Sequence, residues 1–148
     1  MINFNTMAEL IRMAEEKSLP VHDIVLAREM HTSQRSRDVL WQEMQRNWQV
    51  MQESVQRGIA NEEHSVSGLT GGDAKRLYAA REQSYTGTAV MAAAAYAVGI
   101  AEVNAVMGRI VACPTAGSCG IVPAALFAAA QHNGNTEDEI VGALFTAA

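Results

Sequence analysis

A short segment near residue 115 has the side chains and the backbone freedom to bind an anion. Residues 111–123 read VACPTAGSCGIVP, in which proline, glycine, hydroxyl and thiol groups interrupt an apolar run. Gly117 and Gly120 permit positive φ angles and a close approach of a ligand to the backbone. A helix that begins near Ser118 or Cys119 would direct its free N–H groups at this loop, and such groups bind carboxylates and phosphates. The segment therefore predicts an anion-binding loop.

A second segment, residues 64–76, combines glycine and hydroxyl residues ahead of a helix. It reads HSVSGLTGGDAKR, and Asp73 is expected to begin the helix. Backbone N–H groups in such a loop can bind an anion, with Lys75 or Arg76 adding positive charge. The segment matches neither the Walker A pattern nor the dinucleotide-binding fingerprint. A flexible loop between helices is the alternative interpretation.

Cysteines and histidines are the other candidates for chemistry. Cys113 and Cys119 are the only two cysteines, and their C-x5-C spacing is not a disulfide framework. We interpret both as small buried or pocket-lining thiols. His64 is the candidate catalytic base, because it stands beside the glycine-rich segment, and ordinary use in a loop or cap is its alternative. The remaining histidines are expected on helix surfaces or at helix ends: His22, His31 and His132.

Composition limits the function classes. The chain has 148 residues, enough for one domain with a real core, and a net charge of -5. It contains no cluster of lysine and arginine, which argues against nucleic-acid binding. The N-terminal segment is acidic and amphipathic and lacks the basic-then-apolar order of a signal peptide, so we expect a cytoplasmic protein.

The elements that would position these loops are all predicted to be helices. Thr6 and Glu9 form a capping-box pattern at the start of the first helix. Pro20 is expected in the first turn of the second helix. A long polar helix should run over residues 33–58 and end at Gly58, which would adopt a left-handed conformation just past the last turn.

Two alanine-rich stretches are expected to form buried central helices. Residues 89–101 are uncharged but fall short of the roughly 20 apolar residues that span a membrane. Residues 110–130 are long enough, yet prolines and glycines break them in the middle, which lipid does not readily tolerate. Pro123 should lie in the first turn of a helix, where its missing N–H costs least. The sequence thus predicts an all-α, single multi-helix domain over residues 1–148.

The last predicted helix begins at a capping box formed by Thr136 and Glu139. It runs to the end of the chain, which reads FTAA, with no C-cap glycine, basic last turn or polar tail. We therefore expect the chain to be part of a longer protein.

The two motifs together carry a family resemblance. SVSGLTGGDAKR followed by VNAVMGRIVACPTAGSCGIVPAAL resembles the N-terminal part of the alpha subunit, or alpha domain, of the iron-sulfur-dependent bacterial L-serine dehydratases, also called L-serine ammonia-lyases. The resemblance implies conversion of L-serine to pyruvate and ammonia, with a four-iron four-sulfur cluster acting as a Lewis acid on the hydroxyl and a base removing the α-proton. It implies no pyridoxal phosphate.

The resemblance also implies roles for individual residues. The family's loop motif falls on residues that would bind the substrate carboxylate: Thr115, Ala116, Gly117, Ser118, Cys119 and Gly120, preceded by Pro114. The second motif would line the same cavity or the interface with a beta unit, and it matches Ser65, Ser67, Gly68, Thr70, Gly71, Gly72 and Lys75. Asn104 matches an asparagine that could orient the loop or satisfy buried backbone.

The implied partners are L-serine, the remainder of the alpha unit and a beta subunit or domain, in an oligomer. The family's cluster ligands lie in later cysteine-bearing segments, so this chain alone is expected to ligate no cluster and to be inactive. Two alternatives stay open: a non-catalytic helical binding or assembly module, and a relative of the cluster-dependent L-cysteine desulfidases.

Overall fold

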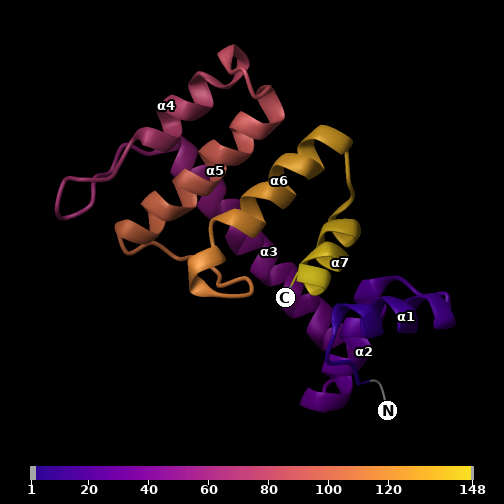
Figure 1. Cartoon of the computed structure of the whole chain (residues 1–148). Coiled ribbons are helices and arrows are strands. Elements are labelled where there is room, and N and C mark those ends of the chain that lie inside the picture. The colour runs from indigo at the N-terminus through magenta and orange to yellow at the C-terminus, as the bar shows by residue number, and fades with distance from the viewer. Residues whose placement is uncertain (1–2, 148) are drawn as a thin grey trace. The chain divides into compact units, whose positions relative to one another are not determined.

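A computed structural model describes residues 3–147 of the protein (Figure 1). The regular secondary structure in that range is helical throughout. The all-α fold class is therefore confirmed. The elements, in chain order, are α1 (Met7–Lys17), α2 (Val21–Ser33), α3 (Arg37–Ala60), α4 (Asp73–Ala79), the 3-10 turn η1 (Arg81–Gln83), α5 (Thr88–Ala105), the 3-10 turn η2 (Ala116–Ser118), α6 (Ile121–Asn133) and α7 (Glu137–Ala147).

The contacts within the chain divide it into two compact units. Unit 1 comprises the residues up to Arg46 together with those from Glu137 onwards, and unit 2 comprises Asn47–Thr136. All the residues assigned to the candidate site fall within unit 2, so its internal packing is what positions them.

Unit 1 begins with the predicted capping box. The Glu9 N–H donates to Thr6 Oγ1 at 3.2 Å, and the Thr6 N–H donates to Glu9 Oε2 at 3.3 Å. These bonds satisfy N–H groups that the first turn of α1 cannot pair internally. Pro20 directly precedes α2 instead of lying inside its first turn, and α7 begins at Glu137, immediately after Thr136, as predicted.

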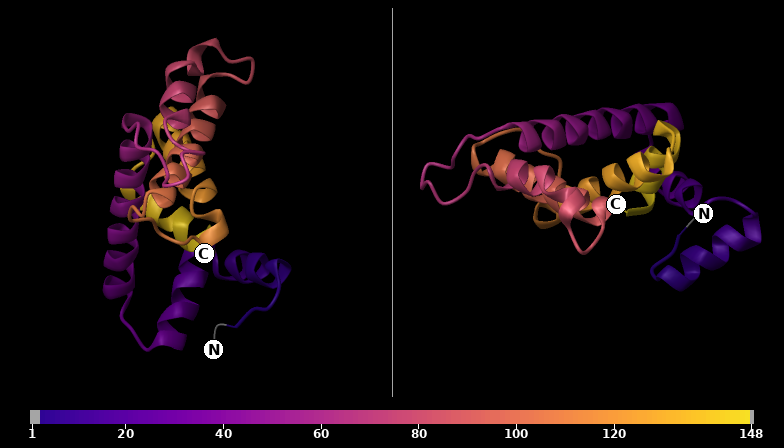
Figure 2. Two further views of the ribbon diagram at one scale, coloured as in Figure 1. Left: turned by 90° about the vertical axis from the view of Figure 1, so that its left-hand side faces the viewer. Right: turned by 90° about the horizontal axis from the view of Figure 1, so that it is seen from above.

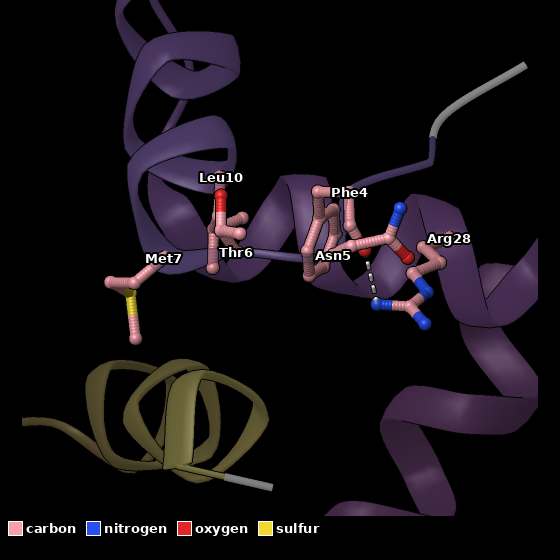
Figure 3. A pocket seen from close by; sticks show the side chains of 6 residues that line it. All are labelled: Phe4, Asn5, Thr6, Met7, Leu10 and Arg28. Carbon is pink, nitrogen blue, oxygen red and sulfur yellow. Dashed lines mark hydrogen bonds between the residues drawn. The ribbon is translucent and has the colours of Figure 1, made fainter.

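The core of unit 1 forms where α2 packs against α7. One cluster of buried side chains comprises Leu26, Leu40, Val141 and Phe145, and a second comprises Leu10, Ala14 and Ile24. A surface hollow of about 310 Å³ lies beside the second cluster and is lined by Phe4, Asn5, Thr6, Met7, Leu10 and Arg28 (Figure 3). Arg28 donates to the Phe4 carbonyl at 3.2 Å, which ties the segment before α1 to α2.

Gly58 does not end α3, and that prediction is wrong. The helix continues to Ala60, and Gly58 lies within it at a crossing with α5. A Cβ atom on Gly58 would lie 2.4 Å from the carbonyl carbon of Gly99, which is shorter than a non-bonded contact between two carbon atoms can be. The missing side chain therefore serves the close packing of two helices.

The alanine-rich helix α5 lies at the centre of unit 2, between α4 and α6 (Figure 2). One face is buried, with Ala95, Tyr96 and Ile100 almost wholly covered. By length and composition alone α5 could cross a membrane, since it has 18 residues and a mean hydropathy of 1.3. In the structure 39% of that stretch is buried inside the protein, so the predicted burial holds for one face of the helix.

Aromatic side chains join α6 to the rest of unit 2. The Tyr96 and Phe127 rings meet edge to face with centroids 5.0 Å apart, and Trp48 lies 6.0 Å from Phe127. The Tyr96 hydroxyl donates to Gln131 Oε1 at 2.7 Å, and burial raises the pKa of Tyr96 above its ordinary value. Pro123 is the third residue of α6, so its predicted place in the first turn is confirmed.

Candidate functional site

The loop that joins α5 to α6 is anchored where it leaves α5. The Gly108 N–H donates to the Val103 carbonyl at 2.8 Å, which closes the end of the helix. The hydroxyl of Ser54, buried on α3, donates to the Arg109 carbonyl at 2.8 Å. An ion pair between Arg109 and Glu53 at 2.7 Å adds a surface contact. The first part of the loop is thus bound to α3 and α5 of unit 2.

Ser118 folds the next part of the loop into a closed turn. Its hydroxyl donates to the Cys113 carbonyl at 2.7 Å and accepts the Thr115 N–H at 3.2 Å. The Thr115 hydroxyl oxygen lies 3.1 Å from Ser118 Oγ. The hydroxyl that the sequence offers as a ligand group therefore already has donors and an acceptor inside the turn. The Cys113–Pro114 peptide bond in this turn is cis.

The exposed tip of this turn consists of Ala116 and Gly117. The hydrogen bonds that shape the turn use the N–H groups of Thr115, Ser118 and Cys119. They leave the N–H groups of Ala116 and Gly117 available at the surface. A Cβ atom on Gly117 would meet only Thr115 Oγ1, at 3.8 Å, so the space above this residue is open. The predicted anion-binding role of the loop would fall on this exposed tip.

Two details of this loop differ from the prediction. The α-helix begins at Ile121, and the turn η2 precedes it, instead of one helix beginning at Ser118 or Cys119. Neither Gly117 nor Gly120 uses a positive φ. Gly120 is buried, and a Cβ atom there would lie 2.9 Å from the Ala97 carbonyl oxygen. Its role is therefore the close contact of α6 with α5.

The glycine-rich segment forms an ordered loop before α4. The Ser65 N–H donates to the Thr70 carbonyl at 2.9 Å, and the Gly68 N–H donates to the Ser65 carbonyl at 2.8 Å. The hydroxyls of Ser65 and Ser67 lie 3.1 Å apart. Gly68 has a φ of 71° and Gly71 one of 142°, so here the glycines do supply conformations that other residues avoid. The segment therefore contains a hydrogen-bonded turn.

The first N–H of α4 is occupied by a side chain of the protein itself. Glu102, which is 8% exposed on α5, accepts the Asp73 N–H on its Oε1 at 2.8 Å. The helix begins at Asp73 as predicted. The sequence analysis assigned no role to Glu102. A lone carboxylate in an alanine-rich helix was the available signal of a buried cap.

Lys75 is paired and His64 lies beside it. A surface hollow of about 450 Å³ is lined by Glu62, His64, Gly72, Lys75, Arg76 and Ala79. Lys75 Nζ donates to Glu62 Oε1 at 2.7 Å, and this bond lowers the pKa of the Glu62 carboxyl. No residue of the 115–120 turn lines this hollow. The single cavity shared by both motifs, and the role of His64 as base, stay predictions.

Cys113 and Cys119 are buried free cysteines. Burial raises the pKa of the Cys113 thiol, which favours the neutral form over the thiolate that binds iron. Within residues 3–147 there is no group of three or more cysteine, histidine or acidic side chains placed to hold a metal ion. These residues do not fit a four-iron cluster by themselves.

Asn104 lies exposed on the last turn of α5. Its backbone carbonyl accepts the Met107 N–H at 3.0 Å, which helps to end the helix. Among the described residues no hydrogen bond joins its side chain to the 115–120 turn. Asn104 therefore contributes to the start of the loop through its backbone carbonyl and not through its side-chain amide.

Comparison with known proteins identifies the family of this chain. The family model described as serine dehydratase alpha chain matches residues 16–148, and the chain belongs to this family. It is 39% identical over 146 residues to the probable L-serine dehydratase alpha chain of Bacillus subtilis, covering 97% of this chain and 48% of that one. It is 35% identical to the L-serine dehydratase alpha chain of Peptoniphilus asaccharolyticus, covering 86% and 44%.

A further relative is the L-serine dehydratase TdcG of Escherichia coli, with 30% identity over 132 residues, 84% of this chain and 28% of that one. The chain thus spans about half the length of the two alpha chains. The resemblance inferred from the two motifs is confirmed.

Proposed function

We propose that this chain is the substrate-binding part of an L-serine dehydratase alpha chain, with the turn at Thr115–Ser118 as the site for the substrate carboxylate. Family membership and the names of the relatives support the reaction class. One observation carries the assignment of the site. The motif places two unused N–H groups, of Ala116 and Gly117, on an exposed and closed turn.

The turn would bind a carboxylate through its backbone. Two adjacent N–H groups can each donate to a carboxylate oxygen, and such charge-assisted bonds are shorter and stronger than neutral ones. The Thr115 side chain accepts the Ser118 N–H and lies 3.1 Å from Ser118 Oγ, so it contributes to the shape of the turn. Ser118 and Gly120 act by shape: Ser118 closes the turn, and Gly120 seats α6 on α5.

Replacing Gly117 with alanine tests this assignment. In the assembled enzyme we expect the KM for L-serine to rise about tenfold with kcat nearly unchanged, because the new methyl group would occupy the open space beside the proposed carboxylate position. The fold should tolerate the change, since its nearest contact is at 3.8 Å. Steady-state pyruvate formation gives both constants.

The matched control is Ala125→Ser, which alters an exposed residue one turn into α6. It should leave KM within about twofold of the wild type. A Gly117→Ala enzyme with an unaltered KM and an unaltered melting temperature would rule out the turn as the carboxylate site.

The cluster implied by the family needs ligands from outside the described residues. Cys113 is favoured as a thiol, and two cysteines are fewer than a cluster requires. We propose that the remainder of the alpha unit supplies the thiolates, that a beta unit completes a cytoplasmic oligomer, and that His64 is a candidate base in that assembly. The part played by this chain is binding and orientation.

The isolated chain is expected to hold no intact cluster and to form no pyruvate. The experiment is anaerobic reconstitution with iron and sulfide, followed by iron and acid-labile sulfide analysis and an assay for pyruvate from L-serine. Stoichiometric iron and sulfide, or turnover by the chain alone, would show that the chain is complete for catalysis.

A further inference from the structure

Large apolar side chains project into solvent near the C-terminal end of α5, beside the glycine-rich loop. Val66 and Leu69 stand at the tip of the glycine-rich loop, with relative exposures of 108% and 85%. Met107, just after α5, is 93% exposed. The glycine-rich loop and Met107 both lie near the C-terminal end of α5. The Asp73 N–H, just after the loop, donates to the Glu102 carboxylate, and the Met107 N–H donates to the Asn104 carbonyl. We call Val66, Leu69 and Met107 the α5-end patch.

The backbone holds these side chains outward. The loop that carries Val66 and Leu69 is closed by the bonds between Ser65 and Thr70, and the Leu69 N–H also donates to Ser67 Oγ at 3.4 Å. Met107 has a φ of 60°, a conformation that non-glycine residues seldom adopt. Ordered backbone that presents large apolar groups to water is typical of a surface that binds another protein segment.

The length of the relatives indicates what covers this patch. The chain matches 48% of the Bacillus subtilis alpha chain and 44% of the Peptoniphilus chain, so about half of an alpha chain is not represented here. We propose that the α5-end patch binds the polypeptide that corresponds to this remaining half. The inference rests on the proposed function, and it adds the surface on which the two halves meet.

The location of the patch gives this contact a consequence for the site. The 115–120 turn follows Met107 in the same loop, and the glycine-rich loop carries Val66 and Leu69 directly. A segment docked on the patch would therefore lie beside the glycine-rich loop and the start of the loop that leads to the 115–120 turn.

The experiment is co-expression of this chain with the part of the Bacillus subtilis alpha chain that the match leaves uncovered, each with its own tag. Complex formation is measured by copurification and mass, and the dissociation constant by titration. The double variant Val66→Ser/Leu69→Ser and the single variant Met107→Ser are expected to weaken the complex at least about tenfold. Gly68 is retained so that the loop keeps its conformation.

Tyr85→Ser is the matched control, because Tyr85 is 109% exposed but lies before the other end of α5. It should change the dissociation constant by less than about twofold. Absence of a wild-type complex, patch variants that bind normally, or an equal loss in Tyr85→Ser would each overturn the proposal. Patch-dependent self-association, or patch-dependent binding to phosphatidylglycerol vesicles, would assign the surface to a second copy or to lipid instead.

L-serine binding measured on the same complex separates this inference from the proposed function. A patch-dependent complex that does not bind L-serine retains the docking surface and removes the proposed substrate site. A complex that binds L-serine but is insensitive to the patch variants retains the proposed substrate site and removes the docking surface. Thermal melts of each variant confirm that the helical unit is intact.

Discussion

Replacing Gly58 with alanine is expected to lower the free energy of unfolding by about 3 kcal/mol, at the upper end of the cost of overpacking. The new Cβ would lie 2.4 Å from the Cα and carbonyl carbon of Gly99, and backbone atoms cannot rotate aside as a side chain can. The helices α3 and α5 would have to separate, with loss of packing around Val55 and Ile100, both buried. Urea denaturation followed by circular dichroism measures the change.

Gly117→Ala is the control for this prediction, because the same methyl group there meets nothing closer than 3.8 Å. It should change stability by less than about 0.5 kcal/mol. A Gly58→Ala protein as stable as the wild type would mean that α3 and α5 do not cross at these glycines.

Glu102→Ala is expected to cost about 2 kcal/mol and to act first on α4. The substitution leaves the Asp73 N–H without its buried acceptor and opens a small cavity. The helix α4 has only 7 residues, too few to persist without tertiary support. Hydrogen exchange of the amides in Asp73–Ala79 should therefore accelerate more than exchange in α6.

Glu102→Gln is the informative companion variant, because the amide keeps an oxygen that can accept the Asp73 N–H. It should retain most of the protection of α4. Equal loss of protection in both variants would show that charge, and not the hydrogen bond, holds the start of the helix. Unchanged exchange in Glu102→Ala would contradict the capping role altogether.

Local signals in the sequence predicted the helices well. The capping box at Thr6 and Glu9, the start of α4 at Asp73 and the place of Pro123 each depend on a few neighbouring residues. Such signals act through backbone groups within one turn, so they can be read without knowledge of the fold. The two loop motifs likewise sufficed to identify the family.

The errors and omissions concern contacts between elements. A glycine commonly marks the C-terminal end of a helix, and this local signal led to the wrong prediction for Gly58. Only the position of Gly99 in the fold shows that Gly58 lies at a helix crossing. Glu102 caps a helix that begins 29 residues earlier, and no local pattern links it to Asp73. Within the loop, the bond from Ser118 to the Cys113 carbonyl was likewise not predicted, and the role of Ser118 toward a ligand stays a prediction.

If the turn is the carboxylate site that we propose, the bond from Ser118 to Cys113 affects the kinetics of substrate capture. Because the turn is closed before any ligand arrives, no loop has to be ordered on binding, and that entropic cost is avoided. Association should then be governed by diffusion and access instead of by a conformational step, and affinity by the dissociation rate. A Ser118→Ala enzyme would have to fold its turn around each substrate molecule.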